Sequence, residues 1–340
     1  MFEMSSIRHA LAGVACAFAL ASGAQGAAAA SYGGLLVFGD SQSDPGNNAA
    51  IIGKDANQVI TDNSYVPVFP YGSGQYSNGD VWAKPFAASI GLPGAGNSYL
   101  AGGGNYAFGG SRVSVDGSDA SPVYPTSIKH VVEGVVATQS GSIPSDFLYV
   151  VAGGGNDARD AIQHAAGLLL ADPSTDLTPF ILNVAGTYAA DVGSIVHTLE
   201  SAGAQHLVVW NVPNLGLTPA VQSAGAGALG TGVANAMSQA LAQALAGDAN
   251  VKLFDIFGLL TDTVLSPGHN GFANVTDACG AAINACSPAT ALFWDGVHPT
   301  AAGHQFIAQR MYMTVVPLPQ SAGLLLVGVV ALVRVGRRRS

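Results

Sequence analysis

Residues 38–47 read Phe-Gly-Asp-Ser-Gln-Ser-Asp-Pro-Gly-Asn, and the interpretation of the whole chain starts from them. They follow Leu35-Leu36-Val37, a short apolar run that is typical of a buried strand. Gly39 and Asp40 favour a turn, so we expect Ser41 at the carboxyl end of that strand, where open α/β sheets place their ligand crevices. A serine there is a candidate nucleophile if a base and an oxyanion hole lie nearby, and an ordinary turn residue otherwise.

The rest of the chain alternates strand-like and helix-like segments. Apolar runs predict four further strands, at 105–108, 146–152, 206–212 and 251–257. Apolar spacing and composition predict helices over 81–90, 157–170, 179–200, 233–245 and 301–313. Strands that alternate with helices form a parallel sheet with right-handed crossovers. We therefore predict the α/β class, as a flavodoxin-like three-layer α/β/α sandwich with a five-stranded parallel sheet.

Both ends of the sequence have the composition of targeting segments. Residues 1–27 contain Arg8, then an apolar run over 10–21 and then small residues, which is the order of a secretory signal peptide. At the other end, Val316-Pro317-Leu318-Pro319 precedes an apolar run over 322–333 and four arginines. That run is shorter than the ~20 residues of a full membrane span. Between the two, no repeat or linker interrupts a single domain over 31–316.

The tail over 317–340 resembles the PEP-CTERM sorting signal of Gram-negative bacteria, in a Val-Pro-Leu-Pro variant. The resemblance implies export with the help of signal peptidase and transient anchoring at the inner membrane. An exosortase-like membrane protease would then remove the tail and leave the protein at the cell surface or outside the cell. A simple C-terminal anchor is the alternative.

The charge and cysteine content of the mature chain exclude several classes of partner. Without the two end segments, 7 Lys and Arg face 20 Asp and Glu, a net charge of about −13. That balance argues against nucleic acid and anionic membrane surfaces. Cys279 and Cys286 remain after Cys16 is removed with the signal, and two cysteines in an exported chain favour one disulfide. No histidine or second cysteine pair has the spacing of a zinc site, so no metal is expected.

Polar motifs follow most of the predicted strands at their carboxyl ends. Ser41 follows the first, Gly110 the second and Asn156 the third, while the segment 295–299 follows the fifth after a loop. Scattered turn residues have no physical reason to gather at one edge of a sheet. This coincidence favours an active site over a set of ordinary turns.

Four segments resemble blocks I, II, III and V of the GDSL, or SGNH, hydrolases, in family order over residues 35–312. They read Phe-Gly-Asp-Ser-Gln-Ser-Asp-Pro-Gly-Asn, Asn-Tyr-Ala-Phe-Gly-Gly, Gly-Gly-Asn-Asp and Asp-Gly-Val-His-Pro. The chain is most similar to the larger secreted esterase and lipase branch. Residues 74–79 depart from that branch, because Gln75 stands where the family often has arginine.

The resemblance implies a Ser41, His298 and Asp295 triad, in which serine attacks, histidine takes its proton and aspartate orients the imidazole. The implied oxyanion hole consists of the backbone N–H groups of Ser41 and Gly110 and the side-chain amide of Asn156. Supporting roles in the surrounding turns fall to Asp40, Asp44, Asn47 and Asp157.

The expected function is that of a secreted serine ester hydrolase, which forms an acyl-enzyme intermediate without a metal or cofactor. Its substrate would be a carboxylic ester, either a lipid or an acyl group on extracellular polysaccharide, and the protein is expected to be a monomer. An acyltransferase with the same triad is one alternative, and a surface or matrix-binding protein without turnover is another. The loops 48–78 and 258–292 are expected to form the walls of the substrate pocket.

Overall fold

The computed structural model describes residues 32–117 and 124–316. The predicted signal peptide and the predicted sorting tail both lie outside these described residues. The segment Tyr32–Thr314 forms one compact unit. Within the described ranges, no helix combines the length and the apolar character that crossing a membrane requires.

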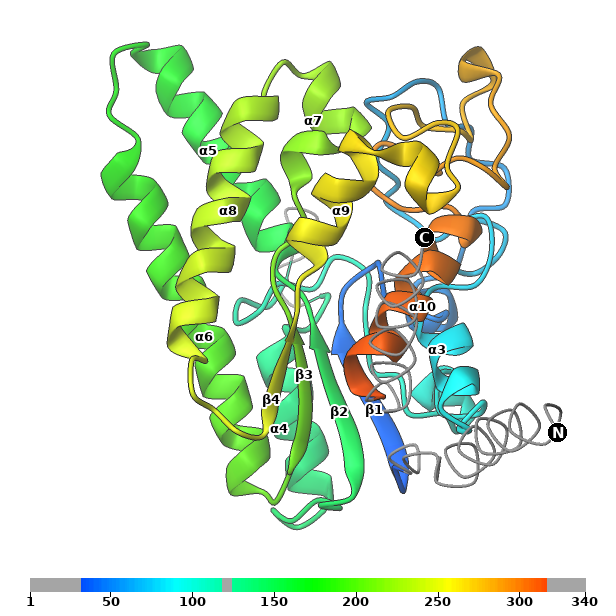
Figure 1. The fold of residues 1–340 in the computed structure, drawn as a ribbon, viewed down its shortest axis with the longest axis vertical. Coiled ribbons are helices and arrows are strands. Elements are labelled where there is room, and N and C mark those ends of the chain that lie inside the picture. The colour runs from blue at the N-terminus through cyan, green and yellow to red at the C-terminus, as the bar shows by residue number, and fades with distance from the viewer. Residues whose placement is uncertain (1–31, 118–123, 317–340) are drawn as a thin grey trace, which may run out of the picture. The chain divides into compact units, whose positions relative to one another are not determined.

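A parallel sheet forms the centre of this unit (Figure 1). Its strands are β1 (Gly34–Gly39), β2 (Phe147–Ala152), β3 (His206–Trp210) and β4 (Val251–Phe254), hydrogen-bonded in the order β1-β2-β3-β4. Val37 pairs with Val150, and Val150 pairs with Val208. Helices lie on both faces of the sheet, so both faces of the strands are buried, which explains their nearly continuous apolar sequence.

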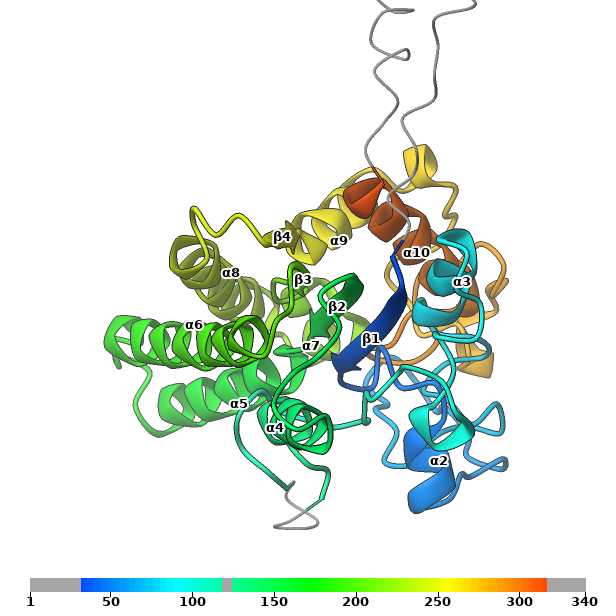
Figure 2. The same ribbon diagram turned by 90° about the horizontal axis from the view of Figure 1, so that it is seen from below.

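Helices cover the two faces of the sheet, as Figure 2 shows from the end of the strands. One face packs against α4 (Ile128–Thr138), α5 (Gly155–Ala171), α6 (Thr178–Ser201) and α8 (Gly227–Ala244). The other side carries α3 (Ala83–Ser89), α9 (Ile256–Leu265) and α10 (Ala301–Val315). Shorter elements of the described chain are α2 (Asn47–Ile51), α7 (Pro219–Ser223), η1 (Tyr99–Ala101), η2 (Leu215–Leu217), η3 (Pro267–Asn270) and η4 (Ala282–Asn284). The α/β class with a parallel sheet is confirmed.

The two faces have different cores. Phe38, Tyr149 and Val151 contribute to the large cluster beneath α4, α5, α6 and α8. On the opposite face, Trp210 packs against Trp82 of the segment leading into α3, with ring centroids 4.8 Å apart. The Trp210 indole N–H also points at the sulfur of Met311 in α10, at 3.2 Å. These contacts fix α10, and with it the turn that immediately precedes this helix.

The prediction of five strands is wrong, because residues 105–108 do not form one. They lie along the free edge of β1, where Tyr106 N donates to Val37 O at 2.8 Å and Phe108 N to Gly39 O at 3.1 Å. Asn105 makes isolated β-bridges, one to Val37 and one to Ser98. Asn105 accepts a hydrogen bond from Ala107 N on its own side-chain oxygen, at 3.0 Å. This local side-chain turn competes with a regular ladder and bends the segment.

The last predicted strand is also shorter than expected. It ends at Phe254, because the Asp255 carboxylate accepts the Gly258 N–H at 2.8 Å and caps α9 at its start. Part of the predicted 258–292 loop is therefore helix α9. Helix α4 was not predicted from the sequence at all.

Candidate active site

Ser41 lies in a tight turn directly after β1. Asp40 closes this turn, since its carbonyl oxygen accepts from Ser43 N at 3.0 Å and its carboxylate accepts from Gln42 N at 3.0 Å. Gly39 allows the turn to form against the neighbouring strand, because a Cβ at this position would lie 2.6 Å from Ala152 O. The sequence therefore places the Ser41 hydroxyl at the carboxyl edge of the sheet.

His298 and Asp295 meet Ser41 from the far end of the chain. His298 Nε2 lies 2.8 Å from Ser41 Oγ, and His298 Nδ1 lies 2.8 Å from Asp295 Oδ2. The Asp295 Oδ1 atom accepts the N–H of Val297 at 2.9 Å and that of His298 at 2.8 Å, which folds residues 295–298 into a turn. A nucleophile, a base and a group that orients the base are thus joined in one hydrogen-bonded chain.

The residues predicted for the oxyanion hole lie around the same turn. Neither Ser41 N nor Gly110 N donates a hydrogen bond to any described residue. Gly110 has a φ of +86°, which a side chain would strain. The Asn156 side-chain amide donates one hydrogen bond to Ser111 O at 2.9 Å, which holds the first turn of α5 beside Gly110. Its NH₂ group has a second hydrogen to donate.

Asp44 and Asn47 connect the Ser41 turn to the segment that carries Gly110. The Asp44 carboxylate accepts backbone N–H groups from Gly46 (2.8 Å), Asn47 (2.6 Å), Asn48 (3.2 Å) and Gly109 (3.0 Å). Asn47 Nδ2 donates to Asn105 O at 3.0 Å and to Ala107 O at 2.7 Å. The nucleophile and Gly110 are therefore held in one rigid assembly.

Two acids lie close to the site, Asp40, which is buried, and Asp157, which is partly buried. Asp157 accepts the Val113 N–H on both carboxylate oxygens, at 3.1 and 3.2 Å. Burial raises the pKa of Asp40 to about 6, and burial likewise raises the pKa of Asp157 to about 6. Because both values exceed the ordinary 3.8, the folded state binds these protons more tightly than the unfolded state. Their ionisation therefore lowers folding stability as the pH rises from about 4 to about 6.

The model of the GDSL-like lipase/acylhydrolase family matches residues 35–311. The chain belongs to this family. The match runs from β1 into α10 and so includes every residue of the Ser41, His298 and Asp295 chain of contacts.

Individual relatives of this GDSL-like chain come from plants and bacteria. A GDSL esterase/lipase of Arabidopsis thaliana is 26% identical, over 84% of this chain and 89% of that protein. Esterase EstA of Pseudomonas aeruginosa is 28% identical, over 88% of this chain and 49% of that protein. This chain thus spans about half the length of its curated Pseudomonas relatives. Among solved structures, a carbohydrate acetylesterase from Sinorhizobium meliloti aligns with a TM-score of 0.44 and 14% identity, over 82% of this chain and 96% of that one.

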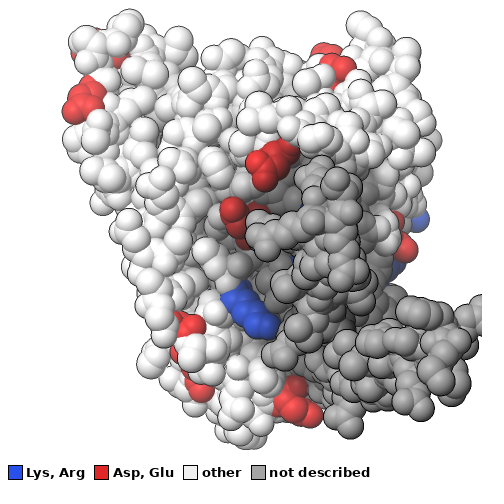
Figure 3. Space-filling view, viewed as in Figure 1, with Lys and Arg blue, Asp and Glu red and all other residues white. Residues whose placement is uncertain are grey.

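The described part of this GDSL-like protein holds no group of three or more His, Cys, Asp or Glu residues that could bind a metal ion. Figure 3 shows one face of the molecule, on which acidic side chains are scattered and basic ones are sparse. That face therefore presents no basic patch of described residues to which a polyanion could bind.

Cys279 and Cys286 are joined by a disulfide, with their Cα atoms 5.5 Å apart. The bonded loop pairs with the backbone that leads into Asp295. Cys279 N donates to Phe293 O at 3.0 Å, and Gly280 N donates to Trp294 O at 2.8 Å. The cross-linked loop thus supports the segment from which the Asp295 turn begins.

Tyr71 is a site residue that the sequence analysis did not identify. Residues 48–78 were expected to be a surface loop, yet Tyr71 and Tyr76 are both buried. The Tyr71 hydroxyl donates to Asp295 Oδ2 at 2.8 Å, and the Tyr76 ring lies 5.4 Å from that of His298. Burial and the charge of Asp295 raise the pKa of Tyr71, which therefore remains a hydrogen-bond donor. The sequence feature that could have indicated Tyr71 is the presence of several tyrosines in the otherwise polar 48–78 segment.

Replacement of Tyr71 by phenylalanine tests its role in positioning Asp295. The Asp295 carboxylate would lose one charge-assisted donor, so we expect kcat to fall by about tenfold. The loss should appear in kcat with KM nearly unchanged, because Tyr71 contacts Asp295 and acts through it. Ester hydrolysis measured over a range of substrate concentrations provides both quantities.

Tyr65→Phe is the matched control, because the Tyr65 hydroxyl in the same segment donates to Gln58 Oε1 at 2.9 Å. We expect this variant to keep the parent kcat and KM. A Tyr71→Phe kcat equal to that of Tyr65→Phe would contradict the positioning role.

Proposed function

We propose that this chain is a serine carboxylic-ester hydrolase that works through an acyl-enzyme intermediate. The observation that carries the proposal is the chain of 2.8 Å contacts from Ser41 Oγ through the His298 ring to Asp295. Membership of the GDSL-like lipase/acylhydrolase family supports it over the entire domain. The names of the relatives, esterase and esterase/lipase, point to the same class of reaction.

In the first half of the reaction, Ser41 Oγ attacks the ester carbonyl carbon as His298 Nε2 takes the hydroxyl proton. Asp295 holds the ring with Nδ1 toward its carboxylate and stabilises the imidazolium that forms. The negative charge that develops on the carbonyl oxygen is stabilised by the N–H groups of Ser41 and Gly110 and by the Asn156 amide. The attack produces a tetrahedral intermediate. When it collapses, the ester C–O bond breaks and His298 gives its proton to the leaving alcohol.

In the second half, a water molecule takes the place of the alcohol beside His298 Nε2. His298 removes a proton from this water, which attacks the acyl carbon bound to Ser41 Oγ. The same donors stabilise the second oxyanion. Breakdown releases the carboxylic acid, and the imidazolium returns its proton to Ser41. All the proton transfers use groups of this chain, and the substrate is a carboxylic ester of a lipid or of a polysaccharide.

Alanine substitutions at the reacting groups test this function. Ser41→Ala and His298→Ala should each reduce ester hydrolysis to near background, while the circular dichroism spectrum stays that of the parent. Asn156→Ala should lower kcat by about 100- to 1000-fold, because one oxyanion donor is lost. Turnover is measured with p-nitrophenyl acetate.

His269→Ala serves as the control, because His269 is an exposed histidine in η3, outside the contacts described above. It should keep the parent rate. Near-normal turnover by the Ser41 or His298 variant would eliminate the triad, and a loss below tenfold would remove Asn156 from the oxyanion hole.

We also propose that the protein is exported and held transiently at the inner membrane by its tail. The order of basic, apolar and small residues in 1–27 and the composition of 317–340 support this. Deletion of residues 322–340 should move the protein from the membrane fraction to the soluble exported fraction without loss of activity. Identical fractionation of the two forms in a host that lacks the matching sorting protease would contradict the proposal.

A further inference from the structure

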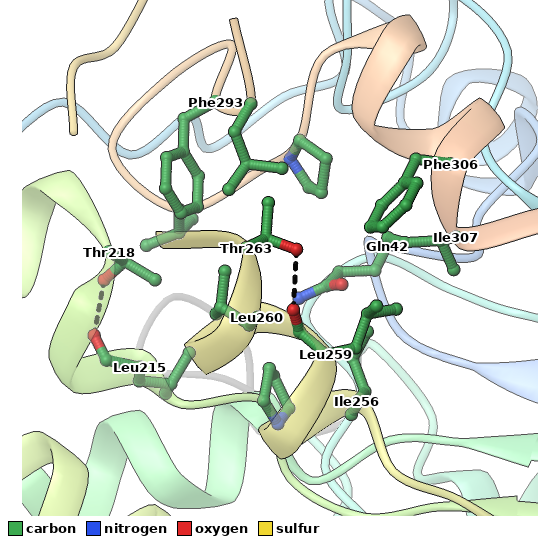
Figure 4. A pocket seen from close by; sticks show the side chains of 14 residues that line it. Gln42, Leu215, Thr218, Ile256, Leu259, Leu260, Thr263, Phe293, Phe306 and Ile307 are labelled. Carbon is green, nitrogen blue, oxygen red and sulfur yellow. Dashed lines mark hydrogen bonds between the residues drawn. The ribbon is translucent and has the colours of Figure 1, made fainter. Parts of the chain in front are cut away.

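A partly open pocket lies beside the Ser41 turn. Gln42, the residue after Ser41, lines one side, while Val297 and Pro299, which flank His298, line another. Most of the remaining wall is apolar and comes from α9, η2, α10 and the segment before Asp295. Figure 4 shows this wall, which includes Leu215, Ile256, Leu259, Leu260, Phe293 and Phe306. The predicted 258–292 wall does line this pocket, through Leu259, Leu260 and Thr263 of α9 and through Leu292. No residue of the predicted 48–78 wall lines it.

The polar side chains of the pocket differ in whether they already have a hydrogen-bond partner. The Thr218 hydroxyl donates to Leu215 O and the Thr263 hydroxyl donates to Leu259 O, each at 2.7 Å, as the dashed lines in Figure 4 mark. Each hydroxyl has already donated its hydrogen, so neither needs an acceptor on a ligand. The Gln42 amide makes no side-chain hydrogen bond to any described residue, and it points into the pocket. The pocket therefore offers an apolar wall with a single unpaired amide next to the nucleophile.

Such a pocket suits the part of the ester that stays bound through both halves of the reaction. The alcohol must leave and water must enter at its place beside His298 Nε2, so that side has to stay open to solvent. The acyl group remains attached to Ser41 until the last step. A recess with an apolar wall excludes water and gains from the burial of methylene groups.

We propose that this pocket binds the acyl chain, that the preferred substrates are esters of linear alkanoic acids longer than acetate, and that Gln42 limits this preference. The inference rests on the proposed ester hydrolysis. Each methylene group buried in the pocket adds about fourfold to kcat/KM, so hexanoate esters should exceed acetate esters by at least 30-fold. A plain alkyl chain leaves the Gln42 amide desolvated and unpaired, which opposes part of this gain.

The test uses two series of esters with the parent enzyme and three variants. In the acyl series, p-nitrophenyl acetate, butyrate, hexanoate and octanoate keep the alcohol constant. In the alcohol series, ethyl, butyl and hexyl acetate keep the acyl group constant. Leu260→Trp fills the pocket and should lower the hexanoate-to-acetate ratio of kcat/KM by at least tenfold. Gln42→Leu removes the unpaired amide and should raise that ratio by at least fivefold.

Leu265→Trp is the matched control, because Leu265 lies on the same helix with 73% of its surface exposed and does not line the pocket. It should leave the ratio at the parent value. A Leu260→Trp ratio equal to that of Leu265→Trp would overturn the proposal, as would a loss confined to the alcohol series. An unchanged ratio in Gln42→Leu would contradict the proposal that Gln42 limits the acyl preference.

Failure of the pocket and failure of the proposed function give different results. Active enzyme with no dependence on acyl length contradicts the pocket alone. Enzyme that hydrolyses no ester in either series contradicts the proposed function. In that case, calorimetric titration with sodium octanoate still tests the pocket, since the parent should bind octanoate at least tenfold more tightly than Leu260→Trp does. Equal binding by the two proteins would overturn the pocket as well.

Discussion

The carboxylate of Asp295 has no exposed surface, and its two oxygens accept hydrogen bonds from three parts of the site. The backbone N–H groups of Val297 and His298 come from its own turn, the Tyr71 hydroxyl comes from the 48–78 segment, and the His298 ring stands toward Ser41. A buried carboxylate that lost these donors would carry a large desolvation penalty. The position of Asp295 therefore constrains the 48–78 segment, the turn before α10 and the His298 ring together.

The buried carboxylate of Asp44 likewise holds several segments together, on the Ser41 side of the site. Asp44 collects four backbone N–H groups and joins the Ser41 turn to Gly109, next to Gly110. The site is thus built from two preformed halves, one around Asp44 and one around Asp295. The 2.8 Å contact between Ser41 Oγ and His298 Nε2 joins them. Preformed halves of this kind suit catalysis, because donors already in place need no reorganisation when charge develops.

Much of this arrangement was accessible from the sequence. The apolar runs that became β1 to β4 and the polar motifs at their carboxyl ends predicted both the parallel sheet and the edge at which the chemistry gathers. Residues 105–108 were predicted as a strand from their apolar character. They form none, because the Asn105 side chain accepts a local hydrogen bond that bends the segment, and apolar composition does not reveal such a bond. Tyr71 was not found, because its partner lies 224 positions away and nothing in the local pattern indicates that pairing. Helix α9 was missed because the apolar run placed Asp255 inside a strand over 251–257, whereas its carboxylate accepts the Gly258 N–H and starts the helix.

The central claim is that Ser41 is a nucleophile activated by its contact with His298. Labelling with a fluorophosphonate, followed by intact mass measurement and peptide mapping, tests this most directly, since the reagent forms a bond only with an activated serine oxygen. The account predicts one adduct per chain, located on Ser41 in the parent, and labelling at least 100-fold slower in the His298→Ala variant. An unlabelled parent, an adduct on another residue, or equal labelling rates in the two proteins would contradict it.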